Sequence, residues 1–169
     1  ALDALGRVVT AASRHNGFNL VAGDTAQVGW TSNRSDGIRR LATGVHGVSN
    51  GLLDDRWPKV QRTMAALDAW CRRGERDLQP LFEALADRTI APDADLPSTG
   101  VALDWERRLS AAFIVGELYG TRCSTVVAIG RDARASFVER TFAPDGSVRG
   151  EVAHAFALDP QDSRRSMAT

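Results

Sequence analysis

The chain lacks long hydrophobic runs, a patterned set of cysteines and any excess of charge. No apolar stretch approaches the roughly 20 residues that a helix needs to cross a bilayer, and the opening residues lack the order of a signal peptide. The two cysteines form neither a C-x-x-C pair nor a disulfide framework, and the three histidines share no metal-ligand spacing. We therefore expect a cytoplasmic protein with no membrane span, no metal and no cofactor.

Charge and aromatic content narrow the possible partners. Basic and acidic residues number 21 each, so the net charge is zero, and Lys59 is the only lysine. The four tryptophans are too scattered to form a base-stacking platform, so we expect no nucleic-acid partner. With 43% hydrophobic and 25% charged residues, the composition predicts one globular domain over residues 1–160 and a flexible tail over residues 161–169.

Hydrophobic spacing and turn residues predict helices and strands in separate blocks. A helix comes first, then strands, then helices, then strands again. The expected helices are residues 2–12, 57–73, 77–88 and 104–110, and the expected strands are residues 18–22, 27–32, 41–49, 122–130, 135–142 and 147–156. This order favours an α+β fold over a parallel sheet built from βαβ units.

A glycine turn delivers Arg122 into the start of a β-branched strand, in the sequence Tyr-Gly-Thr-Arg-Cys-Ser-Thr-Val-Val that begins at Tyr119. A guanidinium at the mouth of a buried strand is costly unless it meets a carboxylate, a carbonyl or a substrate. Arg122 is therefore a candidate site residue. The alternative is a structural arginine that ties a loop to the edge of the sheet.

Several short sequence motifs occur in an order and spacing that can be compared with known families. They are Asn-Gly-Phe-Asn-Leu at residues 16–20, Ser-Asn-Arg at 32–34, Gly-Val-Ser-Asn at 47–50, Leu-Asp-Asp-Arg-Trp-Pro-Lys-Val at 53–60, Leu-Pro-Ser-Thr-Gly at 96–100 and Tyr-Gly-Thr-Arg at 119–122. On these motifs the chain resembles the NRDE-motif family, also called the transport and Golgi organisation protein 2 family, from about residue 16 to about residue 146.

The resemblance also indicates what the chain does not contain. Members of that family open with Met-Cys and carry an Asn-Arg-Asp-Glu signature soon afterwards, and neither is present here. The Asn-Arg-Ser-Asp at residues 33–36 stands where the family has its separate Ser-Asn-Arg motif. The chain therefore looks like the carboxy-terminal two-thirds of a family member.

The resemblance implies a layered α/β/β/α sandwich of antiparallel sheets, like that of the amino-terminal-nucleophile hydrolases, that lacks its first strands. An incomplete sheet exposes unpaired N–H and C=O groups along one edge. The expected partner is the missing amino-terminal segment, or a second chain that completes the sheet.

The resemblance also implies a set of site residues. In the cysteine branch of that superfamily the nucleophile is the first residue, and its own α-amino group is the base. This chain could supply Asn50 as an oxyanion donor and Arg122 as a group that lowers the pKa of the thiol. We predict that His46, Ser49, Asp54 and Tyr119 contact the substrate. Without the resemblance, Asn50 fits a left-handed turn before Gly51.

Two classes of function follow from the family resemblance. One is a cysteine amidohydrolase or acyltransferase that acts on carbon–nitrogen amide bonds, with its nucleophile outside this chain. The other is a non-enzymatic carrier or trafficking protein for haem or for acyl-coenzyme A and lipid, although no haem motif is visible. Either class would bind a small amide, acyl or carboxylate ligand.

Other polar residues receive structural interpretations. Cys71 and Cys123 are read as small buried residues of the core. Asp54 and Asp55 precede a helix and are predicted to cap it, as the alternative to a role at the site. Glu106 is a plausible ion-pair partner for a buried arginine.

We predict that the 169-residue chain alone does not hydrolyse amides, because it does not supply the amino-terminal cysteine. The measurement is the release of free amine from an amide substrate by the isolated chain, with a full-length protein that opens with Met-Cys as the positive control. Turnover by the isolated chain would contradict the prediction.

Overall fold

The computed structural model describes residues 2–11, 14–24 and 26–158. The described chain forms two compact units. The amino-terminal unit runs up to Asp55, and the carboxy-terminal unit spans Arg56–Ala157. The predicted tail over residues 161–169 lies outside the described residues, and the single domain over residues 1–160 stays a prediction.

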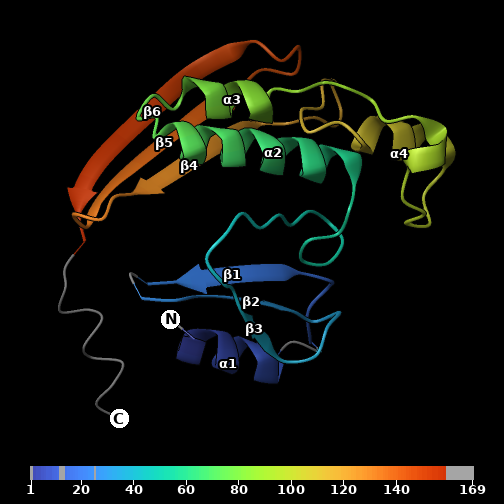
Figure 1. Ribbon diagram of the computed structural model, residues 1–169. Helices are drawn as coiled ribbons and strands as arrows, with labels where there is room; N and C mark the ends of the chain where they lie inside the picture. The colour runs from blue at the N-terminus through green and yellow to red at the C-terminus, as the bar shows by residue number, and fades with distance from the viewer. Residues whose placement is uncertain (1, 12–13, 25, 159–169) are drawn as a thin grey trace. The chain divides into compact units, whose positions relative to one another are not determined.

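The amino-terminal unit contains one helix and one antiparallel sheet. Helix α1 is Leu2–Ala11, and the strands are β1 (Asn19–Gly23), β2 (Val28–Ser32) and β3 (Ile38–Arg40), in the order β1-β2-β3. Leu5 of α1 is fully buried. A Cβ at Gly29 of β2 would collide with Leu2 and Leu5, so the glycine lets α1 pack closely on the sheet (Figure 1).

The carboxy-terminal unit contains helices followed by a second antiparallel sheet. The helices are α2 (Pro58–Arg73), α3 (Gln79–Leu85) and α4 (Leu103–Leu109), with a short 3₁₀ turn at Asp93–Asp95. The strands are β4 (Cys123–Ile129), β5 (Arg134–Phe142) and β6 (Val148–Ala157), in the order β4-β5-β6. Helices α2 and α3 lie side by side along this sheet (Figure 1). The α+β class and the antiparallel sheets are confirmed.

Local sequence explains where α2 begins and ends. Pro58 occupies the first turn, where its missing N–H is not needed. Gly74 adopts the left-handed conformation at φ 62° and donates its N–H to the Cys71 carbonyl 3.1 Å away. The prediction that Asp54 or Asp55 caps α2 is wrong. Trp57 is the N-cap without a side-chain hydrogen bond, and Asp54 and Asp55 accept bonds from Gly47 and Leu52 instead.

The hairpin predicted at Pro144-Asp145-Gly146 is present. Gly146 has φ 81°, and the Asp145 carboxylate accepts bonds from the N–H and the hydroxyl of Ser147 at 2.9 and 2.7 Å.

On β5, the Arg140 guanidinium lies 4.0 Å from the Phe82 ring centroid, donates to Gln79 at 3.0 Å and pairs with Glu151. Arg140 therefore attaches α3 to the sheet.

Several predictions differ from the structure. The extended stretch over residues 41–49 is irregular, and the third strand is β3 instead. The helix predicted over residues 77–88 is shorter, at Gln79–Leu85. Cys71 on α2 and Cys123 on β4 are both exposed. Cys123 is exposed because the inward positions on β4 belong to Ser124 and Val126. Glu106 is buried, and its partners are the N–H and hydroxyl of Thr99, both at 2.6 Å, with no arginine among the described residues.

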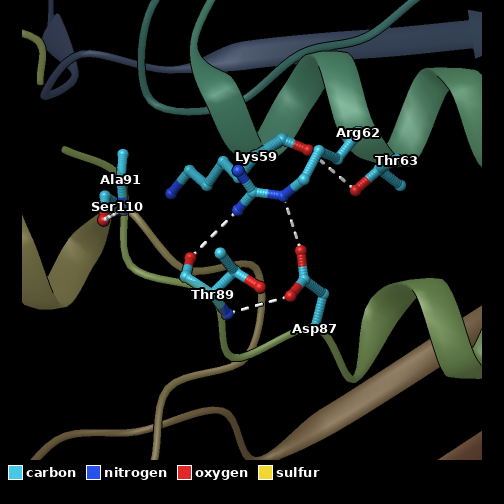
Figure 2. Close-up of polar contacts among 7 residues, drawn as sticks. All are labelled: Lys59, Arg62, Thr63, Asp87, Thr89, Ala91 and Ser110. Carbon is cyan, nitrogen blue, oxygen red and sulfur yellow. Dashed lines mark hydrogen bonds and ion pairs between the residues drawn. The ribbon is translucent and has the colours of Figure 1, made fainter. Parts of the chain in front are cut away.

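A polar cluster fixes α2 to the loops that follow α3 and α4 (Figure 2). Arg62 donates to the Asp87 carboxylate at 2.6 Å and to the Thr89 carbonyl at 2.9 Å. Lys59 donates to the Leu109 carbonyl at 2.7 Å, and burial holds the pKa of its ammonium below the usual value. These bonds satisfy the carbonyl of the last residue of α4 and a carbonyl in the loop after α3, so the cluster has a structural role.

Asp87 is the acceptor on which this cluster depends. Burial acts to raise the pKa of Asp87, but hydrogen bonds from Thr89 and Arg62 and the charge of Arg62 outweigh it, so the pKa lies below its usual value. A carboxyl whose pKa is lowered by folding stabilises the protein above its unfolded pKa, and this stability is lost as the pH falls through the folded pKa.

We predict that Asp87→Asn lowers the free energy of unfolding by about 1 kcal/mol at pH 7 and reduces the loss of stability between about pH 4 and pH 2. The measurement is chemical denaturation of both proteins at about pH 7, pH 4 and pH 2. Asp68→Asn is the control, because Asp68 pairs with Arg72 only at the exposed face of α2. Equal effects from the two substitutions would contradict the role of the cluster.

Candidate functional site

Asn19, the first residue of β1, organises the irregular segment that follows β3. Its side-chain amide donates to the carbonyls of Ser49 at 3.0 Å and Gly51 at 2.8 Å. Its side-chain oxygen accepts the indole N–H of Trp30 at 3.1 Å, and Trp30 is buried. One side chain thus holds residues 49–51 against the sheet and fixes the backbone around Asn50.

The Ser-Asn-Arg segment at residues 32–34 makes a matching set of bonds. The Ser32 hydroxyl donates to the Phe18 carbonyl at 2.7 Å, and the Asn33 side-chain oxygen accepts the Phe18 N–H at 2.9 Å. Asn33 also donates to the carbonyls of His15 and Asn16. The two segments Asn-Gly-Phe-Asn and Ser-Asn-Arg are therefore joined to each other by hydrogen bonds.

Arg34 extends from this network across Gly17. A Cβ on Gly17 would collide with the guanidinium, so glycine leaves the space that the guanidinium occupies. Arg34 Nη1 donates to the Asn50 carbonyl at 3.2 Å. Among the described residues Arg34 has no carboxylate partner, and the residue is exposed.

These residues line one recess, which we call the Arg34 recess. Its volume is about 620 Å³, and its lining comes entirely from the amino-terminal unit: Gly17, Phe18, Asn19, Arg34, Val48, Ser49 and Asn50. Asn50 is exposed, and its side-chain amide makes no hydrogen bond to any other described residue. The recess therefore presents one fixed cation and one free amide.

His46 and Asp54 close the loop whose middle residues line this recess. The Asp54 carboxylate accepts the Gly47 N–H at 3.0 Å and lies 3.0 Å from His46 Nδ1, while the Asp54 N–H donates to the Gly47 carbonyl. His46 Nε2 lies 3.0 Å from the Ala42 carbonyl. Both ring nitrogens face oxygens that only accept, so the imidazolium satisfies both contacts and the neutral ring satisfies one.

Hydrogen bonds and charges in this loop also favour a protonated His46 and an ionised Asp54. The hydrogen bond to Asp54 is the largest cause of a pKa of His46 above its ordinary 6.5. Burial acts to raise the pKa of Asp54, but the bonds from His46 and Gly47 and the charges of His46 and Arg39 together lower it. Arg39, whose Nη2 lies 3.7 Å from Asp54, opposes the charge on His46.

The other predicted site residues belong to the carboxy-terminal unit. Arg122 is exposed and donates to the Glu117 carbonyl at 3.3 Å. Tyr119 packs edge-on against Trp105, with 5.6 Å between the ring centroids. The amino-terminal unit thus brings together Ser49 and Asn50 and places His46 and Asp54 on the same loop. The roles of Asn50 and Arg122 in catalysis stay predictions.

Sequence reasoning did not single out Arg34 or Asn19 as site residues. Both stand in the quoted motifs, Asn19 at residues 16–20 and Arg34 at residues 32–34, and membership of those motifs is the signal that could have identified them. No group of three His, Cys, Asp or Glu side chains in the described ranges could hold a metal ion. Within those ranges no helix is both long and apolar enough to cross a membrane.

Comparison with known proteins identifies the family. The family description "Transport and Golgi organisation 2" matches residues 2–144, most of the chain. The chain is 30% identical over 175 aligned positions to a Transport and Golgi organization protein 2 homolog of Bos taurus, covering 94% of this chain and 63% of that protein. It is 26% identical to a Transport and Golgi organization 2 homolog of Mus musculus, covering 90% of this chain and 60% of that protein.

The chain therefore belongs to the Transport and Golgi organisation 2 family, and the resemblance drawn from the motifs is confirmed. It spans slightly more than three-fifths of the length of the Bos taurus protein and three-fifths of that of the Mus musculus protein. The two segments joined by hydrogen bonds around Arg34 lie inside the matched region.

We predict that the pKa of His46 lies above 6.5 and falls in Asp54→Asn, which removes the carboxylate. A histidine whose pKa is raised by folding stabilises the loop below pH 6.5, and this stability is lost as the pH rises through the folded pKa. NMR titration of the His46 ring measures both values. Arg39→Gln is the control of opposite sign and should raise the pKa of His46. A pKa of His46 unchanged in Asp54→Asn would contradict the role given to the contact between His46 and Asp54.

Proposed function

We propose that this chain supplies the substrate-binding part of a cysteine amidohydrolase, with the Arg34 recess as its ligand site. The nucleophilic cysteine belongs to sequence outside these 169 residues, in keeping with the greater length of the relatives. The substrate is a small molecule that carries an amide and a carboxylate.

One observation carries this proposal. The Asn50 backbone is held on both sides, by Arg34 at its own carbonyl and by Asn19 at the carbonyls of Ser49 and Gly51, while its side-chain amide has no partner among the described residues. An unpaired side-chain amide on a backbone that the fold holds in place supports a role as the donor to an oxyanion.

The proposed reaction is hydrolysis of an amide, in which the acyl group passes first to the cysteine and then to water. The thiolate attacks the amide carbon, and the N–H of Asn50 stabilises the oxyanion of the tetrahedral intermediate. The carbon–nitrogen bond breaks, the amine leaves with a proton, and water hydrolyses the thioester to release the acid and the thiol.

Arg34 would bind the carboxylate of the substrate. A guanidinium with free N–H groups forms charge-assisted hydrogen bonds to a carboxylate, often through two parallel bonds. The guanidinium is already held by the Asn50 carbonyl and by the space over Gly17, so little side-chain entropy is lost on binding.

A second candidate is a carrier that binds the same ligand without turnover. The observation that favours it is that Arg34 and Asn50 are exposed hydrogen-bond donors in one recess, which is sufficient to bind a carboxylate without a nucleophile. Under this alternative the ligand binds to Arg34 and Asn50 and is released unchanged.

The test uses a full-length protein that contains this chain and N-acyl amino acids as probes, with release of free amine as the readout. We expect Asn50→Ala to lower kcat by about 10²–10³-fold. We expect Arg34→Gln to raise KM by about tenfold or more for the free acids and to have little effect on their methyl esters.

Gln61→Ala is the matched control, because it removes an exposed side-chain amide from α2, outside the recess. Binding of the probes without turnover in the wild-type protein would support the carrier. Asn50→Ala and Gln61→Ala proteins of equal activity would overturn the role of Asn50.

A further inference from the structure

A second recess lies within the carboxy-terminal unit and shares no residue with the Arg34 recess. Its volume is about 180 Å³, close to the space of six water molecules at about 30 Å³ each. Two arginines and an apolar wall line it: Arg88, Arg108, Ile90, Ala111, Phe113, Ile114 and Val115. We call it the paired-arginine recess.

Both guanidinium groups are held in place by packing. Arg88 lies 5.2 Å from the Phe113 ring centroid and Arg108 lies 5.0 Å from that of Trp105. Each also lies over a glycine: a Cβ would stand 2.7 Å from Arg88 at Gly146 and 2.8 Å from Arg108 at Gly116. The positions of the charges therefore depend on ring faces and small residues.

Neither guanidinium group forms a hydrogen bond or an ion pair with another described residue. Other arginines of the same unit do form ion pairs, for example Arg62 with Asp87 and Arg107 with Asp93. Asp145 feels the charge of Arg88, but its carboxylate accepts hydrogen bonds from Ser147. Two like charges thus share one recess with their donors unused, an arrangement that an anion would stabilise.

Two main-chain N–H groups of the wall already have partners. The N–H of Phe113 donates to the Asp87 carbonyl, and that of Ile114 donates to the Thr121 hydroxyl. The charged donors that a bound anion would meet in this recess are the two guanidinium groups. The wall itself is apolar and partly open to solvent, since Ile90 is 56% and Val115 is 37% exposed.

We propose that the paired-arginine recess binds a small carboxylic acid with an aromatic or short aliphatic body. The carboxylate lies between Arg88 and Arg108, and the apolar body covers Ile114 and Val115. The volume limits the ligand to a compact acid, since sites for larger organic ligands start at about 300 Å³.

The test titrates the 169-residue chain with benzoate and follows backbone amide shifts by NMR. We expect saturable shifts at residues 111–115 with a dissociation constant in the millimolar range, roughly what a ligand of this size reaches. Acetate and benzyl alcohol, which lack the apolar body and the charge respectively, should each bind at least about tenfold more weakly.

The variants separate the charge from the shape of the recess. Arg88→Gln and Arg108→Gln should each weaken benzoate binding by about tenfold. Arg149→Gln, on the exposed strand β6, should leave it within about twofold. Val115→Asp keeps both arginines and adds a negative charge to the wall, so it should abolish benzoate binding. The protein should stay folded, because Val115 is already exposed to solvent.

Benzoate affinity unchanged in both arginine variants, acetate affinity equal to that of benzoate, or no saturable shift at residues 111–115 would each overturn the proposal. Far-ultraviolet circular dichroism of every variant checks that the fold is retained. Because the shifts are read in the carboxy-terminal unit, failure here leaves the proposal for the Arg34 recess untouched.

Discussion

The side chain of Asn19 is the interaction on which the amino-terminal unit depends. It uses both N–H donors and its oxygen on three partners: Ser49, Gly51 and Trp30. Backbone groups in an irregular segment need partners as much as those in a strand do. Here one amide at the start of β1 supplies partners for two carbonyls, so a loop without regular structure is held against the sheet.

In the carboxy-terminal unit, cationic side chains supply the hydrogen-bond partners of backbone carbonyls that lack a partner in regular structure. Lys59 and Arg62 on α2 satisfy carbonyls at Leu109 and Thr89, and Arg140 on β5 connects α3 to the sheet. Long cationic side chains can reach across an interface and keep their apolar stems packed. The motif Trp-Pro-Lys-Val therefore combines a helix start at Pro58 with a side chain, Lys59, that fixes α2 to the end of α4.

Local signals in the sequence were sufficient for most elements. Pro58 and Gly74 define α2, and Pro144-Asp145-Gly146 defines the last hairpin, because these residues restrict their own backbone angles. The irregular run over residues 41–49 was misread because its bonds come from Asn19 and Asp54, which lie outside it. Cys123 was misread because a run of apolar residues does not reveal which face of a strand is buried.

The sequence motifs also predicted part of the candidate site, but not the contribution of Arg34. The motifs identified the family, and they placed His46, Ser49, Asn50 and Asp54 on one segment. The contribution of Arg34 depends on Gly17, a residue 17 positions earlier in the chain, and such a pairing has no local signal. Whether Asn50 acts together with Arg122 stays a prediction, since the two belong to separate compact units.

The backbone of Asp54 restricts which amino acid can occupy that position. Its φ of 64° lies in the left-handed region, where glycine, asparagine and aspartate are the residues that fit with little strain. Its contacts with the Gly47 N–H and with His46 require a carboxylate, which only aspartate and glutamate provide. Aspartate alone meets both requirements. A substitution that keeps the turn, such as asparagine, loses the charge, and one that keeps the charge, such as glutamate, strains the turn.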